Sequence, residues 1–208
     1  MKALQKDPIN LIVIGVGGQG NVVTSSIICE ALLRDGYIIT FGQSYPAQQR
    51  GGSVINYIRI SREYQASPII PRGRADVIVG MEPVEALRML REYGNPDVHT
   101  MVNPRSIHSM DIALTKTGYP SLDELMETIE ALSAKTWVIK ATEIAREMGT
   151  PIVANVILVG ALFGTGLLPL GRDRIESILE ERFPAALDTN LKAFDKGVEE
   201  AGLIKSRE

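Results

Sequence analysis

The chain has 208 residues, of which 45% are hydrophobic and 23% charged, and its formal net charge is -3. This length and composition predict one globular domain over residues 1–208 with a sizeable buried core. The small net charge gives no basis for expecting a nucleic-acid partner or attraction to an acidic membrane. The N-terminus lacks an apolar signal core, so we expect a cytoplasmic protein.

The N-terminal part predicts a strand, a glycine-rich loop, a helix and a second strand. Residues 11–15 (LIVIG) form a continuous apolar run, which is typical of a parallel strand buried on both faces. Apolar residues then recur at helical spacing over residues 20–34, and Gly36 ends this helix. Residues 37–41 (YIITF) predict the second strand. The loop IGVGGQG at 14–20 therefore connects a strand to a helix.

The rest of the chain alternates strand and helix patterns and becomes helical in its last third. We expect strands at 53–60, 76–81, 98–103 and 136–140, with an irregular hairpin over 61–70. We expect helices at 83–94, 121–134, 141–149, 151–166, 174–183 and 187–202. The helix 151–166 is the most apolar segment, but it is shorter than the roughly 20 residues of a bilayer span, so we expect it to be buried. The whole pattern is that of one α/β domain.

Three glycines suggest a phosphate-binding loop. Gly15, Gly17 and Gly20 match G-x-G-x-x-G between a strand and a helix, where the backbone can approach a phosphate and the helix N-terminus offers free N–H groups. The alternative is a tight turn that binds no ligand. NAD-binding folds place an acid about 20 residues further on, and no acid follows the second strand here. An adenine nucleotide or another phosphorylated carrier therefore fits better than a nicotinamide dinucleotide.

A second segment, FGQSYPAQQRGGSV at 41–54, leaves the carboxyl end of the second strand, where ligands gather in open α/β sheets. Arg50 stands beside Gly51 and Gly52, so it can present a guanidinium together with bare backbone to a phosphate or to a partner chain. The alternative is a solvated arginine in a surface loop.

The sequence offers no catalytic constellation. Its single cysteine, Cys29, can form no internal disulfide, and it cannot hold a [4Fe-4S] cluster, which usually needs four thiolates. His99 and His108 lack metal-ligand spacing, so we predict no metal site. Asn155 lies in an otherwise apolar helix and must satisfy a buried amide, either by capping a neighbouring loop or by facing a ligand. From its residues alone the chain is a binding module without a nucleophile.

The resemblance to a known family rests on six segments, which keep their order along nearly the whole chain: GVGGQG, QRGGSV, SPII, ADVIVGMEPVEALR, VANVILVGAL and NLKAFDKG. Together they resemble the gamma-type domain of the 2-oxoacid:ferredoxin oxidoreductases. QRGGSV and EPVEALR favour the indolepyruvate type, and the gamma subunits of the pyruvate, 2-oxoisovalerate and 2-oxoglutarate types are the alternative. The resemblance implies a Rossmann-like or flavodoxin-like, mostly parallel sheet flanked by helices.

The resemblance also implies partners and cofactors. A large (alpha) subunit would carry thiamine diphosphate and the [4Fe-4S] clusters, ferredoxin would accept the electrons, and coenzyme A would take the acyl group. This chain would have no catalytic residue, would contact coenzyme A and would be inactive alone. The implied ligand or interface residues are Gly15, Gly17, Gly18, Gln19, Gly20, Ser44, Arg50, Gly51 and Asn155. Two other classes are a free-standing dinucleotide-binding oxidoreductase and a subunit that binds only its partner.

Overall fold

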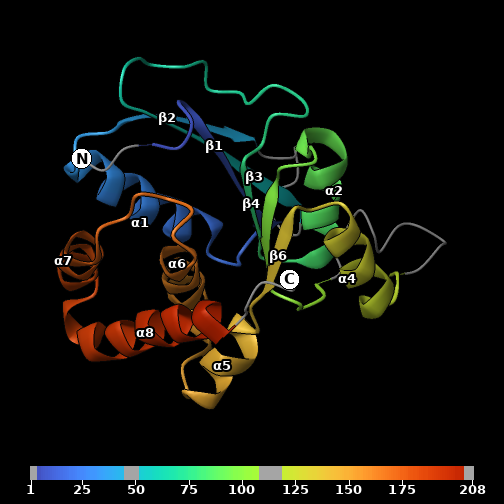
Figure 1. Cartoon of the computed structure of the whole chain (residues 1–208). Helices are drawn as coiled ribbons and strands as arrows, with labels where there is room; N and C mark the ends of the chain where they lie inside the picture. The colour runs from blue at the N-terminus through green and yellow to red at the C-terminus, as the bar shows by residue number, and fades with distance from the viewer. Residues whose placement is uncertain (1–3, 45–51, 108–118, 204–208) are drawn as a thin grey trace.

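The computed structural model describes residues 4–44, 52–107 and 119–203. The described chain is an α/β structure built on one six-stranded sheet with the strand order β2-β3-β1-β4-β5-β6 (Figure 1). Its strands are β1 (Ile9–Val16), β2 (Ile38–Ser44), β3 (Ser53–Ser61), β4 (Val77–Gly80), β5 (His99–Val102) and β6 (Lys135–Val138). Strands β1, β4, β5 and β6 pair in parallel, whereas β3 pairs antiparallel with β1 and β2. The expectation of a mostly parallel sheet flanked by helices is confirmed.

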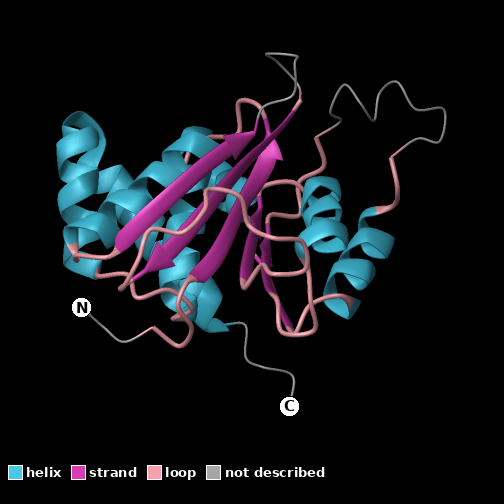
Figure 2. Ribbon diagram, turned by 90° about the horizontal axis from the view of Figure 1, so that it is seen from above, coloured by secondary structure: helices cyan, strands magenta, loops and turns pink. Residues whose placement is uncertain are grey.

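Helices cover both faces of the sheet (Figures 1 and 2). One face carries α1 (Asn21–Arg34), α5 (Ala141–Glu147), α6 (Ala154–Thr165), α7 (Arg172–Arg182) and α8 (Leu187–Leu203). The other face carries α2 (Pro83–Tyr93) and α4 (Leu122–Ala131). Short 3-10 turns at Pro151–Val153 and Pro184–Ala186 precede α6 and α8. No helix of the described ranges is long and apolar enough to cross a membrane.

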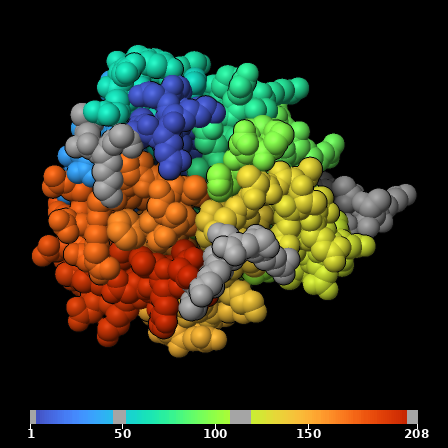
Figure 3. Space-filling model, viewed as in Figure 1, coloured from blue at the N-terminus to red at the C-terminus, as the bar shows by residue number. Residues whose placement is uncertain are grey.

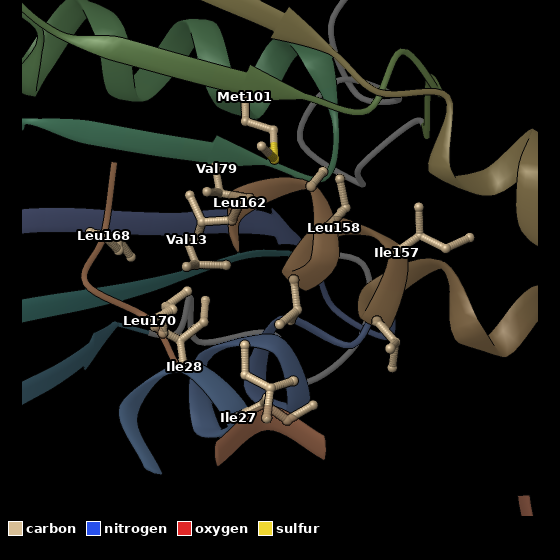
Figure 4. Close-up of a cluster of buried hydrophobic side chains, with 14 of the residues drawn as sticks. Val13, Ile27, Ile28, Val79, Met101, Ile157, Leu158, Leu162, Leu168 and Leu170 are labelled. Atoms are coloured by element: carbon tan, nitrogen blue, oxygen red, sulfur yellow. The ribbon is translucent and has the colours of Figure 1, made fainter. Parts of the chain in front are cut away.

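The main core lies between the sheet and α6, which is buried along most of its length. In the close-up, Val13, Val79 and Met101 of the sheet lie near Leu158 and Leu162 of α6 (Figure 4). Burying a continuous apolar helix in this way contributes about 1.5–3 kcal/mol for each large side chain. The hydrophobic run that was predicted to be a buried helix therefore organises the C-terminal third.

Helices α6 and α8 are in unusually close contact, because two glycines remove side chains from their interface. A Cβ placed on Gly160 would lie 2.0 Å from the Phe194 carbonyl oxygen, and one on Gly197 would lie 2.0 Å from the Ile157 carbonyl oxygen. Helix α6 also packs on α1, as does α7. In the space-filling view the orange and red surface of α6–α8 adjoins the rest of the molecule (Figure 3). The C-terminal third thus holds α1 in place.

Most expected element boundaries are confirmed within a few residues, including the capping box of Ser121 and Glu124 at the start of α4. The hairpin expected over 61–70 is wrong, because the chain forms an irregular loop after β3. Arg59 donates a hydrogen bond to the Ser67 carbonyl at 3.2 Å and holds this loop against the sheet. Pro68 and Pro71 lack the N–H groups that a returning strand would need.

Candidate functional site

The glycine-rich loop joins the carboxyl end of β1 to the N-terminus of α1, as the sequence predicts. Gly18 and Gly20 have φ angles of 99° and 85°, which residues with a side chain rarely adopt. Gly20 is the N-cap of α1, which has neither a side-chain cap nor an acidic residue in its first turn. No described residue accepts a hydrogen bond from the backbone N–H groups of Gly18 and Gly20. Free donors and the positive end of the helix dipole therefore lie together, as an anion site requires.

Gln19 shapes this loop with its side chain. Its Oε1 accepts a hydrogen bond from the Val16 N–H at 2.6 Å, and its Nε2 donates to the Met81 carbonyl at 2.9 Å. The side chain thus ties the carboxyl end of β1 to that of β4. Gly15 has a packing role as well, since a Cβ there would lie 2.9 Å from the Met81 Cβ. Within the predicted motif, Gly18 and Gly20 are the positions that leave donors for a ligand.

The loop opens on a cavity of about 500 Å³ at the carboxyl edge of the parallel strands. This edge is the usual ligand position in open α/β sheets. The cavity wall is formed by the glycine loop, by residues that follow β4 and β5, by α5 and by the start of α6. The lining residues are Gly17, Gly18, Gln19, Gly20, Val23, Met81, Asn103, Arg105, Ile107, Thr142, Pro151, Ile152, Ala154, Asn155 and Leu158. Ile152 is 81% exposed at this wall, so an apolar side chain borders the cavity.

Asn155 lies in the cavity wall beside the glycine loop. It is only 9% exposed, and its Oδ1 accepts a hydrogen bond from the Val156 N–H at 2.9 Å. Its Nδ2 would lie 3.1 Å from a Cβ placed on Gly20, and no residue in the described ranges accepts a hydrogen bond from it. The amide borders both the glycine loop and the cavity, so both roles that the sequence leaves open stay predictions.

The other predicted site residues fall into two groups. Ser44 is exposed at the end of β2, on the same edge of the sheet but outside the cavity wall. Arg50 and Gly51 lie outside the described residues. The neighbouring Gly52 accepts a hydrogen bond at 3.0 Å from the Gly17 N–H. Gly52 of the segment 41–54 therefore contacts the glycine loop.

Sequence reasoning missed three polar residues of the wall, Asn103, Arg105 and Thr142. The Asn103 Nδ2 donates to the Thr142 Oγ1 at 2.9 Å, which links the exit of β5 to the start of α5. Each residue follows the carboxyl end of β5 or β6 by one to four positions. Their position relative to those strand ends was the available signal.

Glu82, also missed, is a fully buried carboxylate next to the cavity residue Met81. Its Oε2 caps α2 by accepting the Glu85 N–H at 2.9 Å. Its Oε1 accepts hydrogen bonds from the Tyr119 hydroxyl and, at 3.4 Å, from the Ile107 N–H. Burial and this contact with Glu82 raise the pKa of the Tyr119 phenol. Glu82 therefore anchors two segments beside the site and is already satisfied by donors.

The described residues offer binding groups rather than reactive ones. Burial raises the pKa of the Cys29 thiol to about 12, so a thiolate is not formed at neutral pH. His99 lies on β5 beside the Trp137 ring, with 5.8 Å between ring centroids. No group of three or more His, Cys, Asp or Glu side chains within the described ranges is arranged to hold a metal ion.

The fold and site define an α/β protein with free backbone donors of a glycine loop at the carboxyl ends of its parallel strands. A family model described as pyruvate ferredoxin/flavodoxin oxidoreductase matches residues 10–200. The chain therefore belongs to this family, and the prediction made from the six sequence segments is confirmed.

Curated relatives match the chain over nearly its full length. It is 35% identical to the indolepyruvate oxidoreductase subunit IorB of Archaeoglobus fulgidus, over 93% of this chain and 95% of that protein. It is 36% identical to the subunit of the same name from Pyrococcus horikoshii, over 92% of this chain and 95% of that protein. These relatives are subunits of an oxidoreductase complex by name.

Solved structures show the same fold. A keto/oxoacid ferredoxin oxidoreductase gamma subunit from Geobacter sulfurreducens matches with a TM-score of 0.63 and 23% identity, over 93% of this chain and 98% of that one. A 2-oxoglutarate:ferredoxin oxidoreductase from Magnetococcus marinus, with 2-oxoglutarate, coenzyme A and succinyl-CoA bound, matches with a TM-score of 0.75 and 20% identity. That match covers 98% of this chain but 32% of the Magnetococcus chain, so this chain spans about a third of its length.

Proposed function

We propose that the chain is the small subunit of a 2-oxoacid:ferredoxin oxidoreductase of the indolepyruvate type. The near-complete match to subunits of that name at 34–36% identity supports this proposal. The complex would oxidatively decarboxylate an arylpyruvate to an acyl-CoA and reduce ferredoxin. Thiamine diphosphate and the [4Fe-4S] clusters belong to the large subunit in this proposal, because the chain has one cysteine. The cytoplasmic location expected from the sequence stays a prediction.

We further propose that the chain contributes to coenzyme A binding. The observation that carries this proposal is the loop of Gly18 and Gly20, whose free N–H groups border a cavity of about 500 Å³. A diphosphate at this loop would accept charge-assisted hydrogen bonds from the backbone and would benefit from the dipole of α1. Asn155, which packs against Gly20, would add a side-chain amide beside the loop. The coenzyme A bound in the Magnetococcus protein, part of which shares this fold, supports the choice of ligand.

In this proposal the chain's residues bind and orient while the partner performs the chemistry. The backbone of the glycine loop would hold the phosphates. The Gln19 side chain would keep this loop in place by its hydrogen bonds with Val16 and Met81. Exposed Ile152 and the apolar cavity residues around it would exclude water from the ligand once the partner covers them. Arg50, from the segment 41–54, would pair with a phosphate or anchor the large subunit.

The alternative substrate assignment is supported by weaker relatives. The pyruvate synthase subunit PorC of Methanothermobacter marburgensis is 31% identical over 86% of this chain. A free-standing dinucleotide-dependent oxidoreductase is disfavoured, because the strand β2 and its exit residue Ser44 offer no acid for a ribose. An NADH fluorescence titration of the isolated chain would detect that function, and we expect no binding.

The test of the proposed function is substrate-dependent ferredoxin reduction by the chain purified with its large subunit. We expect the highest kcat/KM with indolepyruvate, compared with pyruvate, 2-oxoisovalerate and 2-oxoglutarate, and turnover that depends on coenzyme A. The isolated chain should be colourless and inactive. A preference for 2-oxoglutarate would overturn the substrate assignment. An iron–sulfur absorption band from the isolated chain would overturn the assignment of the clusters to the large subunit.

Arg50→Ala separates the two roles proposed for that residue. A lost phosphate contact should raise the KM for coenzyme A about tenfold or more while the complex stays assembled. A lost interface anchor should release the chain on size-exclusion chromatography and leave the KM of the remaining complex unchanged. We favour the phosphate role, because Gly51 and Gly52 beside Arg50 leave room for close backbone approach.

A further inference from the structure

A second, smaller cavity of about 220 Å³ adjoins the one at the glycine loop. The two cavities share Asn103, Arg105 and Thr142 in their walls. The smaller one lies between the segment that leaves β5 and helix α5, further along the carboxyl edge of the sheet. A ligand seated at the glycine loop can therefore extend into this space without leaving the protein surface.

Two arginines from different elements line the smaller cavity. Arg105 follows β5 by three residues, and Arg146 lies in the last turn of α5, which follows β6. Because β5 and β6 are parallel neighbours, their carboxyl ends bring both guanidinium groups to one place. Neither arginine forms an ion pair with a carboxylate of the described chain, whereas Arg34, Arg172 and Arg182 all do.

The remaining groups of the smaller cavity suit an anion. Among the described residues of its wall Glu143 is the only carboxylate, and its Oε2 forms an exposed ion pair with the Lys140 Nζ at 3.5 Å. The Thr142 Oγ1 accepts the Asn103 Nδ2 hydrogen bond, so its own hydroxyl proton is left to donate. The Ser106 hydroxyl also lines this cavity, but it already forms a hydrogen bond with the Tyr119 phenol. Two forked cations and the Thr142 hydroxyl around 220 Å³ match the oxygens of a phosphate group.

We infer that Arg105 and Arg146 form a second anion subsite, which binds a phosphomonoester on a ligand whose diphosphate lies at the glycine loop. This inference rests on the proposed coenzyme A function, and it assigns the smaller cavity to the 3′-phosphate of the adenosine moiety. A phosphomonoester carries up to two negative charges near neutral pH, so it benefits most from two guanidinium groups. The chain would thereby distinguish coenzyme A from carriers that lack this phosphate.

The test compares coenzyme A with 3′-dephospho-coenzyme A in the complex of the chain with its large subunit. The unmodified complex should show a KM for the dephospho form about tenfold or more above that for coenzyme A. Arg105→Ala and Arg146→Ala should each raise the KM for coenzyme A by about tenfold and leave the KM for the dephospho form unchanged. The ratio of the two KM values then falls toward one, while kcat at saturation is retained. Arg105→Lys should keep part of the discrimination, because a lysine supplies charge without the guanidinium fork.

Arg62→Ala is the matched control. Arg62 is an exposed arginine that follows β3, at the amino ends of the parallel strands and thus far from the two cavities. Its side chain has no ion pair within the described ranges. This variant should leave both KM values unchanged, so it measures the general effect of removing one positive charge.

The outcomes separate this inference from the function on which it rests. Equal losses for both ligands in the arginine variants would overturn the subsite, and so would an unchanged KM for coenzyme A. Asn155→Ala, beside the glycine loop, should instead raise the KM for both ligands alike. If Asn155→Ala and Gly18→Val both leave coenzyme A kinetics unchanged, the loop assignment fails. If they act as expected while the arginine variants do not, the second subsite alone is wrong.

Discussion

The two edges of the sheet satisfy their polar groups in opposite ways. At the amino ends of the parallel strands, protein groups pair with each other: the Asp76 carboxylate accepts the Lys6 ammonium at 2.5 Å and the Asn10 N–H at 2.7 Å. At the carboxyl ends, the N–H groups of Gly18 and Gly20 meet no acceptor in the described chain. Backbone polar groups are present at both ends of the strands, so the difference lies in what each end leaves for a ligand.

This contrast indicates where substitutions should affect binding and where they should affect stability. Groups that are already paired inside the protein contribute to the free energy of unfolding, whereas donors left open contribute only when a ligand arrives. The largest expected effects come from the glycine loop, where an added side chain lowers both the stability of the protein and its affinity for the ligand. Smaller effects come from groups whose partners lie within the protein.

Gly20→Val should have the largest effect. The φ of 85° is unfavourable for a β-branched residue, and the new Cβ would lie 3.1 Å from the Asn155 Nδ2. We expect the variant to lose about 2–3 kcal/mol of stability and to raise the KM for coenzyme A by more than tenfold. Urea unfolding and steady-state kinetics of the complex measure the two effects.

Gly18→Ala sharpens that test, because nothing lies within 4 Å of its added Cβ and only the φ of 99° is unfavourable. It should cost about 1–2 kcal/mol. A Gly20→Val variant with unchanged coenzyme A kinetics would contradict the role of the loop, since the clash with Asn155 would then be of no consequence for binding.

Glu82→Ala tests an exception to the contrast, a fully paired group at the carboxyl edge. The substitution removes the cap of α2 and the acceptor for the Tyr119 hydroxyl and the Ile107 N–H. We expect a loss of about 2–3 kcal/mol in unfolding free energy. Glu82→Gln should lose less, because its amide oxygen still accepts. An Ala variant as stable as the parent would show that these contacts are not formed in solution.

Asp76→Asn is the counterpart at the amino edge. It removes the charge that pairs with Lys6 but keeps an oxygen that can accept the Asn10 N–H. Because the Lys6 side chain is half exposed, we expect a stability loss below about 1 kcal/mol. The KM for coenzyme A should not change. A changed KM would contradict the division between a structural edge and a ligand-binding edge.

The sequence predicted most elements of the fold because their signals are local. The apolar run of β1, the glycine that ends α6 and the capping box at Ser121 each depend on neighbouring residues. The loop after β3 was misjudged, because Arg59 holds it by a contact eight residues away. The glycine loop was found from spacing, whereas Arg105 and Arg146 were not, because only the pairing of β5 with β6 brings them together.

The smallest effect is expected on the face of the sheet that α1 and α7 cover, away from both ends of the strands. The Arg34 guanidinium forms two hydrogen bonds with the Glu181 carboxylate, at 2.7 and 2.6 Å, and joins α1 to α7. These hydrogen bonds lower the pKa of the Glu181 carboxyl from 4.5 to about 2. A carboxyl whose pKa is lower in the folded state stabilises the protein above pH 4.5, and this contribution is lost as the pH falls toward 2.

Arg34→Met should weaken that pH dependence, because the Glu181 carboxyl then loses the main cause of its lowered pKa and keeps only the contributions of Ser177 and Arg182. We expect the Tm of the variant to lie at most a few degrees below that of the parent at pH 7, because the pair is exposed and screened by water. The difference should shrink as the pH is lowered from 5 toward 2, and it should also shrink in 1 M salt. Thermal unfolding followed by circular dichroism across this pH range measures both trends. A Tm difference that stays constant from pH 7 to pH 3 would show that Arg34 stabilises α1 through the packing of its aliphatic stem, since packing does not titrate.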